Sequence, residues 1–437
     1  MQKLPFCLRL PSCALLLVVA VCVLAVGAGR QARAEARLLV EVESGKVLEA
    51  EDATIPWYPA SVTKLTTLYV TLKALKAGRI TLDTLFSVSP NAAAQEPAKM
   101  GFPIGTKVTV DNAMKMMMVK SANDMAVLLA EGVSGSIEKF ADEMNDVARE
   151  LGMTETSYVN PNGLPAEGQI TSARDLAILA RALIREFPEY DLYWHIPAIK
   201  FGRRVMRNFN PLIDRYPGAD GMKTGFICAS GYNLVATATR NDKRLIAVVL
   251  GAPSATARMI HAAQLLERGF NGETLTWLTP APGTVEELKP MQASPPDLHD
   301  TICAKHPHKK GKPRAENEEA DASELSDPAV QAFMLSNLRG SNLKPGSLLS
   351  PSLPSMPPIV VFTGPPKSGA KTQIATKTFQ NALSAAKSGE TAAGMSLNKH
   401  SGTVFGPSTE AFEPATSDSI PLPRPRPKIA KVKSAKR

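Results

Sequence analysis

The sequence predicts a mixed α/β domain, mainly an antiparallel sheet flanked by helices, with a long disordered C-terminal tail. Three observations predict it. Apolar strand patterns occur at residues 37–48 and again at 232–250, and helical periodicity lies between them. The 35 prolines are concentrated late in the 437 residues. This length suggests two or three domains, so composition allows one large domain and a second, different part.

The N-terminus has the features of an export signal. Lys3 and Arg9 make its start basic, residues 14–26 are an unbroken apolar run, and Ala32-Arg33-Ala34 offers a small-x-small cleavage site. We expect residues 1–34 to be removed as a signal peptide, leaving an exported, periplasmic protein. The alternative is an uncleaved membrane anchor, but the apolar run is shorter than the roughly 20 residues of a spanning helix.

Few cysteines remain in the exported chain. Three of the five cysteines (Cys7, Cys13 and Cys22) leave with the signal. Cys228 remains in the domain and Cys303 in the tail. We therefore expect no disulfide framework, although an exported protein could form one.

The first part of the mature chain alternates strands and helices. Residues 37–42 have a strand pattern, a Ser-Gly-Lys turn follows, and the return strand starts at Val47. A helix begins near Ser61 and ends at Gly78, with leucines at helical spacing between them. A second helical stretch spans residues 112–132. We expect its methionines in the core, because methionine is a flexible gap-filler: Met114, Met117 and Met118.

The second part predicts a helix and then antiparallel strands. A third helix begins after Ser172. Strand patterns at residues 232–238 and 244–250 are joined by Asn241-Asp242, which is typical of a hairpin turn. A closing helix spans residues 258–268, with the glycine that follows as its C-cap.

These elements place the domain at residues 35–278 and the tail at residues 279–437. The tail is rich in Pro, Ser and Lys and buries too little apolar surface to offset chain entropy, so we expect it to be largely disordered. Within it, residues 329–338 suit a short helix and residues 359–362 are a lone apolar patch. Proline and arginine alternate from Pro421, which favours a polyproline conformation.

Three short motifs occur in order along the domain: Ser61-Val62-Thr63-Lys64, Ser121-Ala122-Asn123 and Lys223-Thr224-Gly225. Each is weak by itself, because the first pattern recurs in the tail, starting at Ser368, Ser384 and Ser396. The ordered set, with each member on an element that can present it, is the signature of serine acyl-transferases of the penicillin-binding type.

The first motif pairs a nucleophile with a base. A serine hydroxyl is a poor nucleophile unless a neighbouring group takes its proton. Lys64 lies three residues after Ser61 and so on the same helix face, while the start of a helix suits a developing anion. Lysine acts as a base only when it is neutral, which burial or the second positive charge of Lys223 would favour. The alternative is an N-cap serine beside a solvated lysine.

The other two motifs predict the rest of a cleft. Ser121 and Asn123 alternate, so the hydroxyl can pass protons while the amide holds a substrate carbonyl; alternatively, Asn123 or the following aspartate caps the next helix. Lys223 and Thr224 can hold a carboxylate, and Gly225 lets an extended peptide approach the backbone. The alternative for this motif is an ordinary turn.

Longer segments resemble the low-molecular-weight penicillin-binding proteins, which are serine-type D-alanyl-D-alanine carboxypeptidases. The resemblance covers about residues 36–272 and implies a penicillin-binding/β-lactamase-like fold. The similar segments are residues 59–64, 120–124, 160–164, 172–175, and 220–226 continuing to 231–236.

The resemblance also implies roles in catalysis. Ser61 would attack the carbonyl of the penultimate D-alanine of a peptidoglycan stem peptide and form an acyl-enzyme, which water then hydrolyses. Lys64 would take the serine proton, and Ser121 would relay a proton to the leaving amine. β-Lactam antibiotics would acylate Ser61 as covalent inhibitors, and no cofactor is expected.

Substrate-binding roles follow from the same resemblance. Asn123 would hold the substrate backbone, and Lys223 and Thr224 would engage the terminal carboxylate beside Gly225. The backbone N–H groups of Ser61 and Phe226 would form the oxyanion hole. A further cation, Arg258, would either add positive potential near the carboxylate or lie on the surface.

The C-terminal part of the sequence bears on membrane attachment and other partners. Many members of the family carry a β-rich domain and a C-terminal amphipathic helix, and neither pattern is found here. The basic tail could touch anionic lipid or wall polymer, or be a solvated linker. No nucleic-acid partner is expected, and no metal site either, since Cys303, His306 and His308 lack an obvious fourth ligand.

Rival functions share parts of these motifs. A class A β-lactamase would need a glutamate to activate water for deacylation, and Glu167 is the residue on offer. A D,D-endopeptidase would cut cross-links with the same groups. A non-catalytic wall-binding or β-lactam-sensing module would not need all three motifs.

Overall fold

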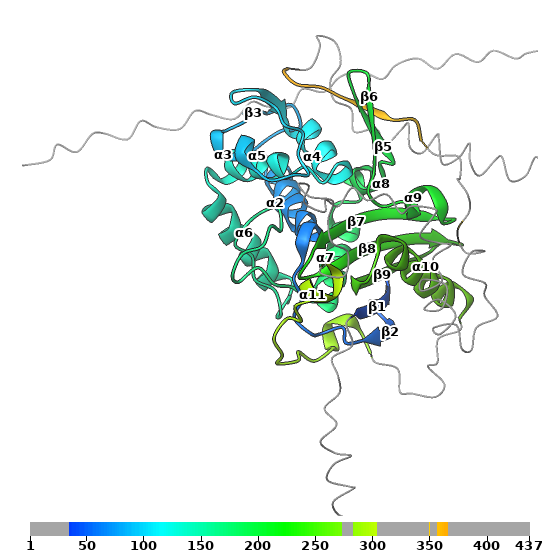
Figure 1. Cartoon of the computed structure of the whole chain (residues 1–437). Coiled ribbons are helices and arrows are strands. Elements are labelled where there is room, and N and C mark those ends of the chain that lie inside the picture. The colour runs from blue at the N-terminus through cyan, green and yellow to red at the C-terminus, as the bar shows by residue number, and fades with distance from the viewer. Residues whose placement is uncertain (1–34, 273–282, 304–348, 350–355, 366–437) are drawn as a thin grey trace, which may run out of the picture. The chain divides into compact units, whose positions relative to one another are not determined.

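The computed structural model describes residues 35–272, 283–303, 349 and 356–365 (Figure 1). By contacts the chain divides into two units, residues 1–384 and 385–437, and the second lies outside the described residues. The expected signal peptide, the short helix at 329–338 and the basic tail also lie outside them, as does the domain boundary at residue 278.

A five-stranded antiparallel sheet forms the centre of the domain, in the order β2-β1-β9-β8-β7 (Figure 1). Asn241 and Asp242 join β8 to β9 with φ of 49° and 61°, the two positive values that a type I′ turn requires. The predicted strands and hairpin are thus confirmed. The strands are β1 (Ala36–Glu41), β2 (Val47–Glu51), β7 (Ala219–Ile227), β8 (Gly231–Arg240) and β9 (Lys243–Ala252).

Two long helices pack on this sheet. They are α7 (Ala173–Glu186), which begins after Ser172 as expected and is capped by that side chain, and α10 (Ala255–Asn271). Helix α10 runs past Gly269, and its C-cap is Gly272 with φ of 71°. The expected cap at Gly269 was therefore wrong. Gly269 is buried inside the helix instead, where a Cβ would lie 2.7 Å from Leu245 and 2.8 Å from Leu39.

Helices α2 to α6 gather on one side of the sheet (Figure 1). The helix predicted over residues 112–132 is in fact two, because Ser121, with φ of 57°, breaks it. The methionines of its first half are buried as expected. The elements are α2 (Lys64–Lys76), β3 (Leu85–Ser87), α3 (Pro90–Ala94), β4 (Lys107–Thr109), α4 (Val110–Val119), α5 (Asn123–Ser134) and α6 (Ile137–Glu150).

Short elements complete the domain. A hairpin, β5 (Ala198–Phe201) and β6 (Arg204–Arg207), rises beside α4 (Figure 1). The remaining short helices are η1 (Ala60–Thr63), η2 (Pro188–Tyr190), α8 (Leu192–His195), α9 (Leu212–Arg215), η3 (Val285–Glu287) and α11 (His299–Ile302).

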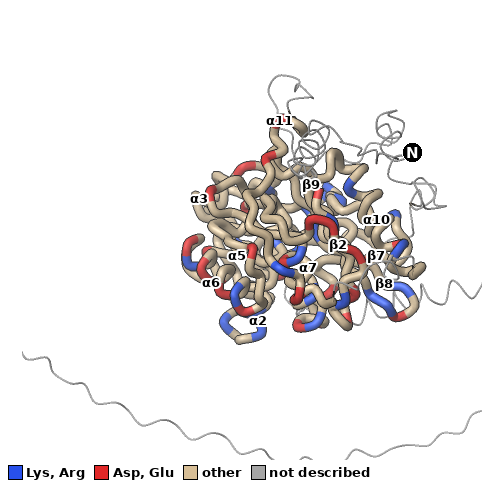
Figure 2. The backbone as a smooth tube through the Cα atoms, turned by 90° about the horizontal axis from the view of Figure 1, so that it is seen from below, with Lys and Arg blue, Asp and Glu red and all other residues tan. Residues whose placement is uncertain are grey.

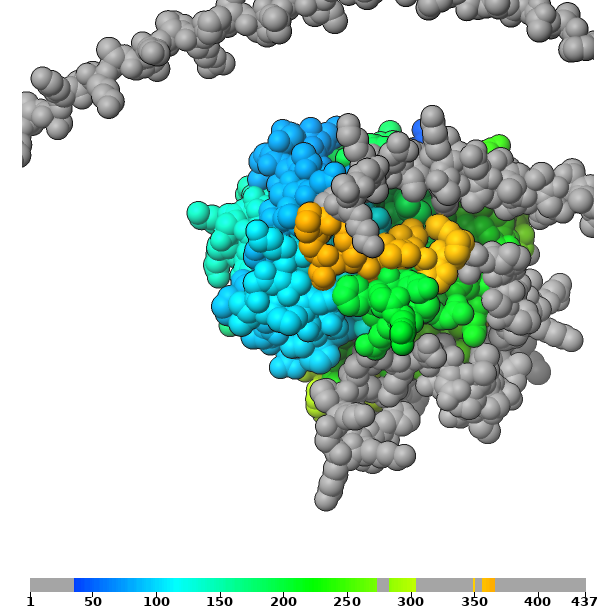
Figure 3. Space-filling view, turned by 90° about the horizontal axis from the view of Figure 1, so that it is seen from above, coloured from blue at the N-terminus to red at the C-terminus, as the bar shows by residue number. Residues whose placement is uncertain are grey.

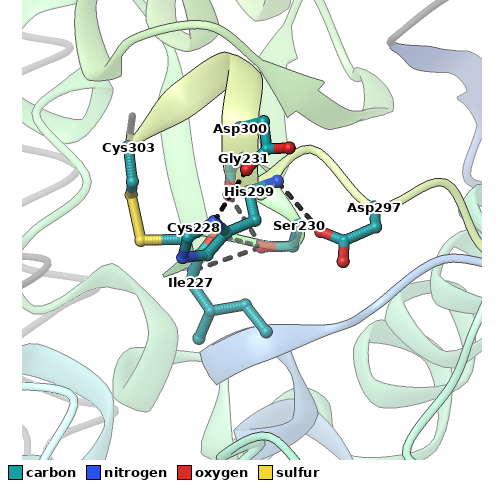
Figure 4. The surroundings of a disulfide bond; sticks show 8 residues. All are labelled: Ile227, Cys228, Ser230, Gly231, Asp297, His299, Asp300 and Cys303. Atoms are coloured by element: carbon teal, nitrogen blue, oxygen red, sulfur yellow. Dashed lines mark hydrogen bonds and ion pairs between the residues drawn. A yellow bond between two sulfur atoms is a disulfide. The ribbon is translucent and has the colours of Figure 1, made fainter. Parts of the chain in front are cut away.

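Part of the predicted tail belongs to the folded unit. Cys228, just after β7, forms a disulfide with Cys303, 75 residues later (Figure 4). The backbone N–H of Leu298 also donates to the Ala229 carbonyl at 2.9 Å. The expectation of no disulfide was wrong, because nothing in the sequence showed that the chain after residue 283 returns to the end of β7.

A second return occurs at the apolar patch of the tail. Strand β10 (Ile359–Val361) pairs in parallel with β5, so the patch is not isolated. The Phe362 N–H donates to Asn112 Oδ1 of α4 (3.2 Å), and the Gly364 N–H donates to the Lys107 carbonyl of β4 (2.7 Å). Figure 3 shows this segment, in orange, lying across the surface between the cyan elements and the green hairpin.

Charged residues of both signs lie close together along the backbone around α2 and α6 (Figure 2). One ion pair links the two helices, Lys73 of α2 with Glu150 of α6 at 2.5 Å, and a second joins Arg79, just after α2, to Glu143 of α6 at 2.7 Å. Because these groups are in contact with solvent, each pair adds only about 0–1 kcal/mol. Among the described residues, no helix is both long and apolar enough to cross a membrane.

Candidate active site

Ser61 lies in the short helix η1, on a backbone that the central sheet holds in place. Ala60, the residue before it, has a φ of 49°, which non-glycine residues rarely adopt. The Asn233 amide of β8 donates to the carbonyls of Tyr58 (2.9 Å) and Pro59 (3.1 Å). These two hydrogen bonds fix the chain immediately before the serine.

Lys64 is fully buried and lies against Ser61. Because residues 60–63 form a 3₁₀ helix, the side chains at positions i and i+3 nearly eclipse each other. Lys64 Nζ donates to Ser61 Oγ at 2.7 Å, to Asn123 Oδ1 at 2.8 Å and to the Asn162 carbonyl at 2.9 Å. The alternative of a solvated lysine is therefore wrong.

Ser121 lies at the break between α4 and α5 and is fully buried. Its positive φ is a strained conformation for a serine, and such strain concentrates at functional sites. Lys223 Nζ donates to Ser121 Oγ at 2.9 Å and to the Thr224 carbonyl at 2.8 Å. The second and third sequence motifs therefore meet directly.

The Asn123 side chain connects Lys64 to a neighbouring loop. Its Oδ1 accepts from Lys64, and its Nδ2 donates to the Glu96 carbonyl at 2.8 Å. The N-cap of α5 is Ala122, which makes no side-chain cap hydrogen bond, so the alternative of a capping residue was wrong. Buried Asp124 instead accepts from two backbone N–H groups of the loop at residues 100 and 101, and burial raises its pKa.

The third motif lies in β7, the edge strand of the sheet, and not in a turn. Thr224 is buried, and its Oγ1 has no hydrogen-bond partner among the described residues. A Cβ on Gly225 would lie 2.9 Å from the Pro59 carbonyl oxygen and 3.0 Å from Ser61 N. Only a glycine therefore allows β7 to approach the nucleophile segment so closely. The ring of Phe226 stacks on Tyr232, with centroids 4.3 Å apart.

The loop at residues 160–169 closes the other side of η1. Gly163, with φ of 82°, lies so near Ala60 that a Cβ would be 1.8 Å from its carbonyl oxygen. Gln169 Nε2 donates to Thr63 Oγ1 at 3.1 Å. Sequence reasoning missed the Asn162 carbonyl as a partner of Lys64. The Asn-Pro-Asn-Gly composition signalled a turn, but no pattern assigns a role to a backbone oxygen.

Arg258 is buried in α10, so the surface alternative for it was wrong. Its guanidinium donates to the Asn233 carbonyl at 3.3 Å and lies 5.7 Å from the ring centre of Tyr232. A contribution to the carboxylate site stays a hypothesis. Among the described residues no cluster of His, Cys, Asp and Glu could hold a metal, and Cys303 is bound in the disulfide.

Comparison with known proteins places this geometry in a family. The sequence family described as D-alanyl-D-alanine carboxypeptidase matches residues 24–254. The chain belongs to this family. D-alanyl-D-alanine carboxypeptidase DacC from Escherichia coli K12 is 40% identical over 255 residues, covering 56% of this chain and 64% of that protein.

Solved structures of related proteins resemble this fold. Penicillin binding protein 5 from Haemophilus influenzae is 34% identical with a TM-score of 0.52, over 54% of this chain and 70% of that one. Penicillin binding protein 6B from Escherichia coli is 35% identical with a TM-score of 0.52, over 54% and 76%. The predicted family and the mixed α/β, penicillin-binding-protein-like fold are confirmed.

The match to this carboxypeptidase family does not extend over whole relatives. The chain spans 64% and 65% of the length of two curated relatives, so less than two thirds of each is compared. The family match therefore applies to residues 24–254 of the chain.

Proposed function

We propose that the chain is a serine-type D-alanyl-D-alanine carboxypeptidase that removes the terminal D-alanine from peptidoglycan stem pentapeptides. The observation that carries the proposal is the contact of 2.7 Å between Lys64 Nζ and Ser61 Oγ. A lysine accepts a proton only when neutral, and burial favours that form. Lys64 would take the Ser61 proton as Oγ attacks the penultimate D-alanine carbonyl.

The remaining groups would serve the later steps. Ser121, hydrogen-bonded to Lys223, would deliver a proton to the leaving D-alanine amine. The Thr224 hydroxyl, which has no partner in the part of the chain that the structure describes, and the Lys223 ammonium would bind the terminal carboxylate. Asn123 keeps one amide N–H beyond its bond to the loop, and this would hold a substrate carbonyl.

The oxyanion would be stabilised by the backbone N–H groups of Ser61 and Phe226, which the close approach of Gly225 supports. Water would then release the shortened peptide. Related proteins are named for penicillin binding, so we propose that β-lactams acylate Ser61. We also propose that the protein acts in the periplasm, after removal of residues 1–34.

Substitution of the nucleophile tests this function. Ser61→Ala should lower D-alanine release from a pentapeptide by at least about a thousandfold and abolish covalent labelling by fluorescent penicillin. Circular dichroism checks that the variant folds. The matched control is Ser368→Ala, which alters the same pattern in the tail and should leave both activities unchanged. D-Alanine release that survives Ser61→Ala would refute the mechanism.

A further inference from the structure

Strand β7 carries one extra residue before the third sequence motif. Ala219 pairs with Ala238 of β8. The next pair is Gly221 with Thr237, so Asp220 is left between them without a partner in β8. Such a β-bulge changes the direction of the side chains that follow it, and bulges are frequent next to active sites. The bulge therefore sets which residues of β7 reach the catalytic groups.

The bulge brings Lys223 to the active site. Lys223 pairs with Val235 in the observed register. Without the extra residue, Met222 would lie opposite Val235, and a shift of one residue turns each side chain to the other face of a sheet. The contact of 2.9 Å between Lys223 Nζ and Ser121 Oγ would then be lost. The position of this lysine depends on the structure three residues before it.

An arginine of β9 holds the bulge in place. Arg244 Nε lies 3.2 Å from Asp220 Oδ2, and Thr239 Oγ1 of the intervening strand β8 donates to the same oxygen at 2.5 Å. On its other side, Arg244 Nη1 donates to Asp191 Oδ1 at 3.0 Å, and Nη2 lies 3.4 Å from His195 Nε2. One guanidinium thus links β7 to both ends of the short helix α8.

These ion pairs are largely shielded from water. The side chains of Arg244, Asp220 and Asp191 are 18%, 17% and 22% exposed. A planar guanidinium can meet two carboxylates at fixed angles, whereas the ammonium group of a lysine is a compact point charge. Arg244 is therefore not replaceable by another cation in this arrangement.

Gly221, just after the bulge, is held by packing as well. Helix α8 lies beside β7 (Figure 1), and a Cβ on Gly221 would be 2.8 Å from Trp194 of that helix. The Asn210 side chain donates to the Gly221 carbonyl at 3.0 Å. The bulge and helix α8 are therefore joined both by close packing and by the charges of Arg244 and Asp220.

We propose that Arg244 is a positioning residue for Lys223 and acts through Asp220 and the bulge. In the proposed function, on which this inference rests, Lys223 binds the terminal carboxylate of the substrate. Arg244 lies two strands away from this lysine and fixes the strand that carries it. Its loss should weaken recognition of the carboxylate more than it slows the attack by Ser61.

Penicillin and its methyl ester test the proposal, because the ester lacks the free carboxylate. The preference for the free acid is the ratio of the two second-order rate constants of acylation. We expect Arg244→Gln to lower this preference about tenfold, because small misplacements in a site are costly, and Arg244→Lys should not restore it. Asp220→Asn should have a similar effect. The double variant should lose no more than either single variant, because the two residues act as a unit.

The matched control is Arg268→Gln, which removes an arginine of α10 that is ion-paired with Glu49 at 2.7 Å and should keep the preference. Circular dichroism checks that each variant folds. A wild-type preference in Arg244→Gln and Asp220→Asn, an equal slowing of acid and ester, or losses that add in the double variant would overturn the inference. Failure of the proposed function gives a different result, namely a wild type that neither compound acylates.

Discussion

Gly225 is the residue at which the edge strand comes closest to the nucleophile. The Cβ of an alanine there would be 2.9 Å from the Pro59 carbonyl oxygen and 3.0 Å from Ser61 N, and both are backbone atoms. The strand or the nucleophile segment would have to shift by several tenths of an ångström. A shift of that kind changes the geometry of attack more than it changes the core.

We predict that Gly225→Ala slows acylation by fluorescent penicillin by about tenfold or more, because small misplacements at a reacting centre are costly. A time course of penicillin labelling, quenched at set intervals, measures the acylation rate. The control is Gly78→Ala, at a position with φ of 68° and open space around it. That variant should lose about 1 kcal/mol of unfolding free energy from its left-handed conformation and acylate normally. Wild-type acylation in Gly225→Ala would contradict the prediction.

For Lys64, the sequence predicted a side-chain partner but not a backbone partner. The spacing of Ser61 and Lys64 was enough to predict their contact, since three residues bring side chains together in either type of helix. The Asn162 carbonyl, 98 residues away from Lys64, could not be predicted. Every residue has a carbonyl, so which one meets a lysine depends on the folded loop.

For the helices and strands, sequence periodicity predicted that an element exists better than it predicted where the element begins and ends. The helix predicted over residues 112–132 breaks at Ser121, where the need to present a hydroxyl and an amide to Lys223 and Lys64 overrides helical propensity. Glycine was also misread: Gly269 looked like a C-cap but lets α10 pack closely on Leu39 and Leu245. A pattern cannot distinguish a glycine that ends a helix from one that allows close packing.

Strand β10 is an element that periodicity could not assign to the domain. Val361 is 1% exposed, and burial of such a side chain stabilises a protein by about 2 kcal/mol. We predict that removing residues 356–437 lowers Tm by roughly 5 °C. It should also favour self-association through the unpaired edge of β5. Calorimetry and light scattering measure the two effects.

Two controls separate the strand from the rest of the tail. Removing only residues 366–437 keeps β10 and should leave Tm near that of the full chain. Among point variants, Val361→Asp should reproduce the loss, whereas Val360→Asp should not, because Val360 is 63% exposed. Equal Tm values for the two truncated proteins would show that β10 does not stabilise the domain.

For the whole molecule, the sequence indicated one folded domain and a tail, and the domain was largely predictable. Local patterns suffice for the hairpin of β8 and β9, which are neighbours both in sequence and in space, but not for the pairing of β1 with β9 from the other end of the domain. The returns of the tail to the domain were not predictable. Cys228 and Cys303 are 75 residues apart, and no pattern in the intervening sequence predicts that they meet. Cysteine counting alone therefore gave the wrong answer.

The disulfide between Cys228 and Cys303 should affect the stability of the whole domain. Closing a loop of 75 residues restricts the unfolded chain, which stabilises the folded one by about 4 kcal/mol on the chain-entropy account. Cys303→Ser should thus lower Tm by roughly 10 °C, and a reducing agent should do the same to the wild type. The Cys228→Ser/Cys303→Ser double variant should have the same Tm as the single variant and be insensitive to reductant.

The hydrogen bonds of Ser61, Lys64 and Lys223 described above involve neither cysteine. Penicillin labelling at 25 °C should therefore persist in the single variant, in the double variant and in the reduced wild type. A wild-type Tm that does not respond to reductant would mean that the tail is not covalently tied to β7.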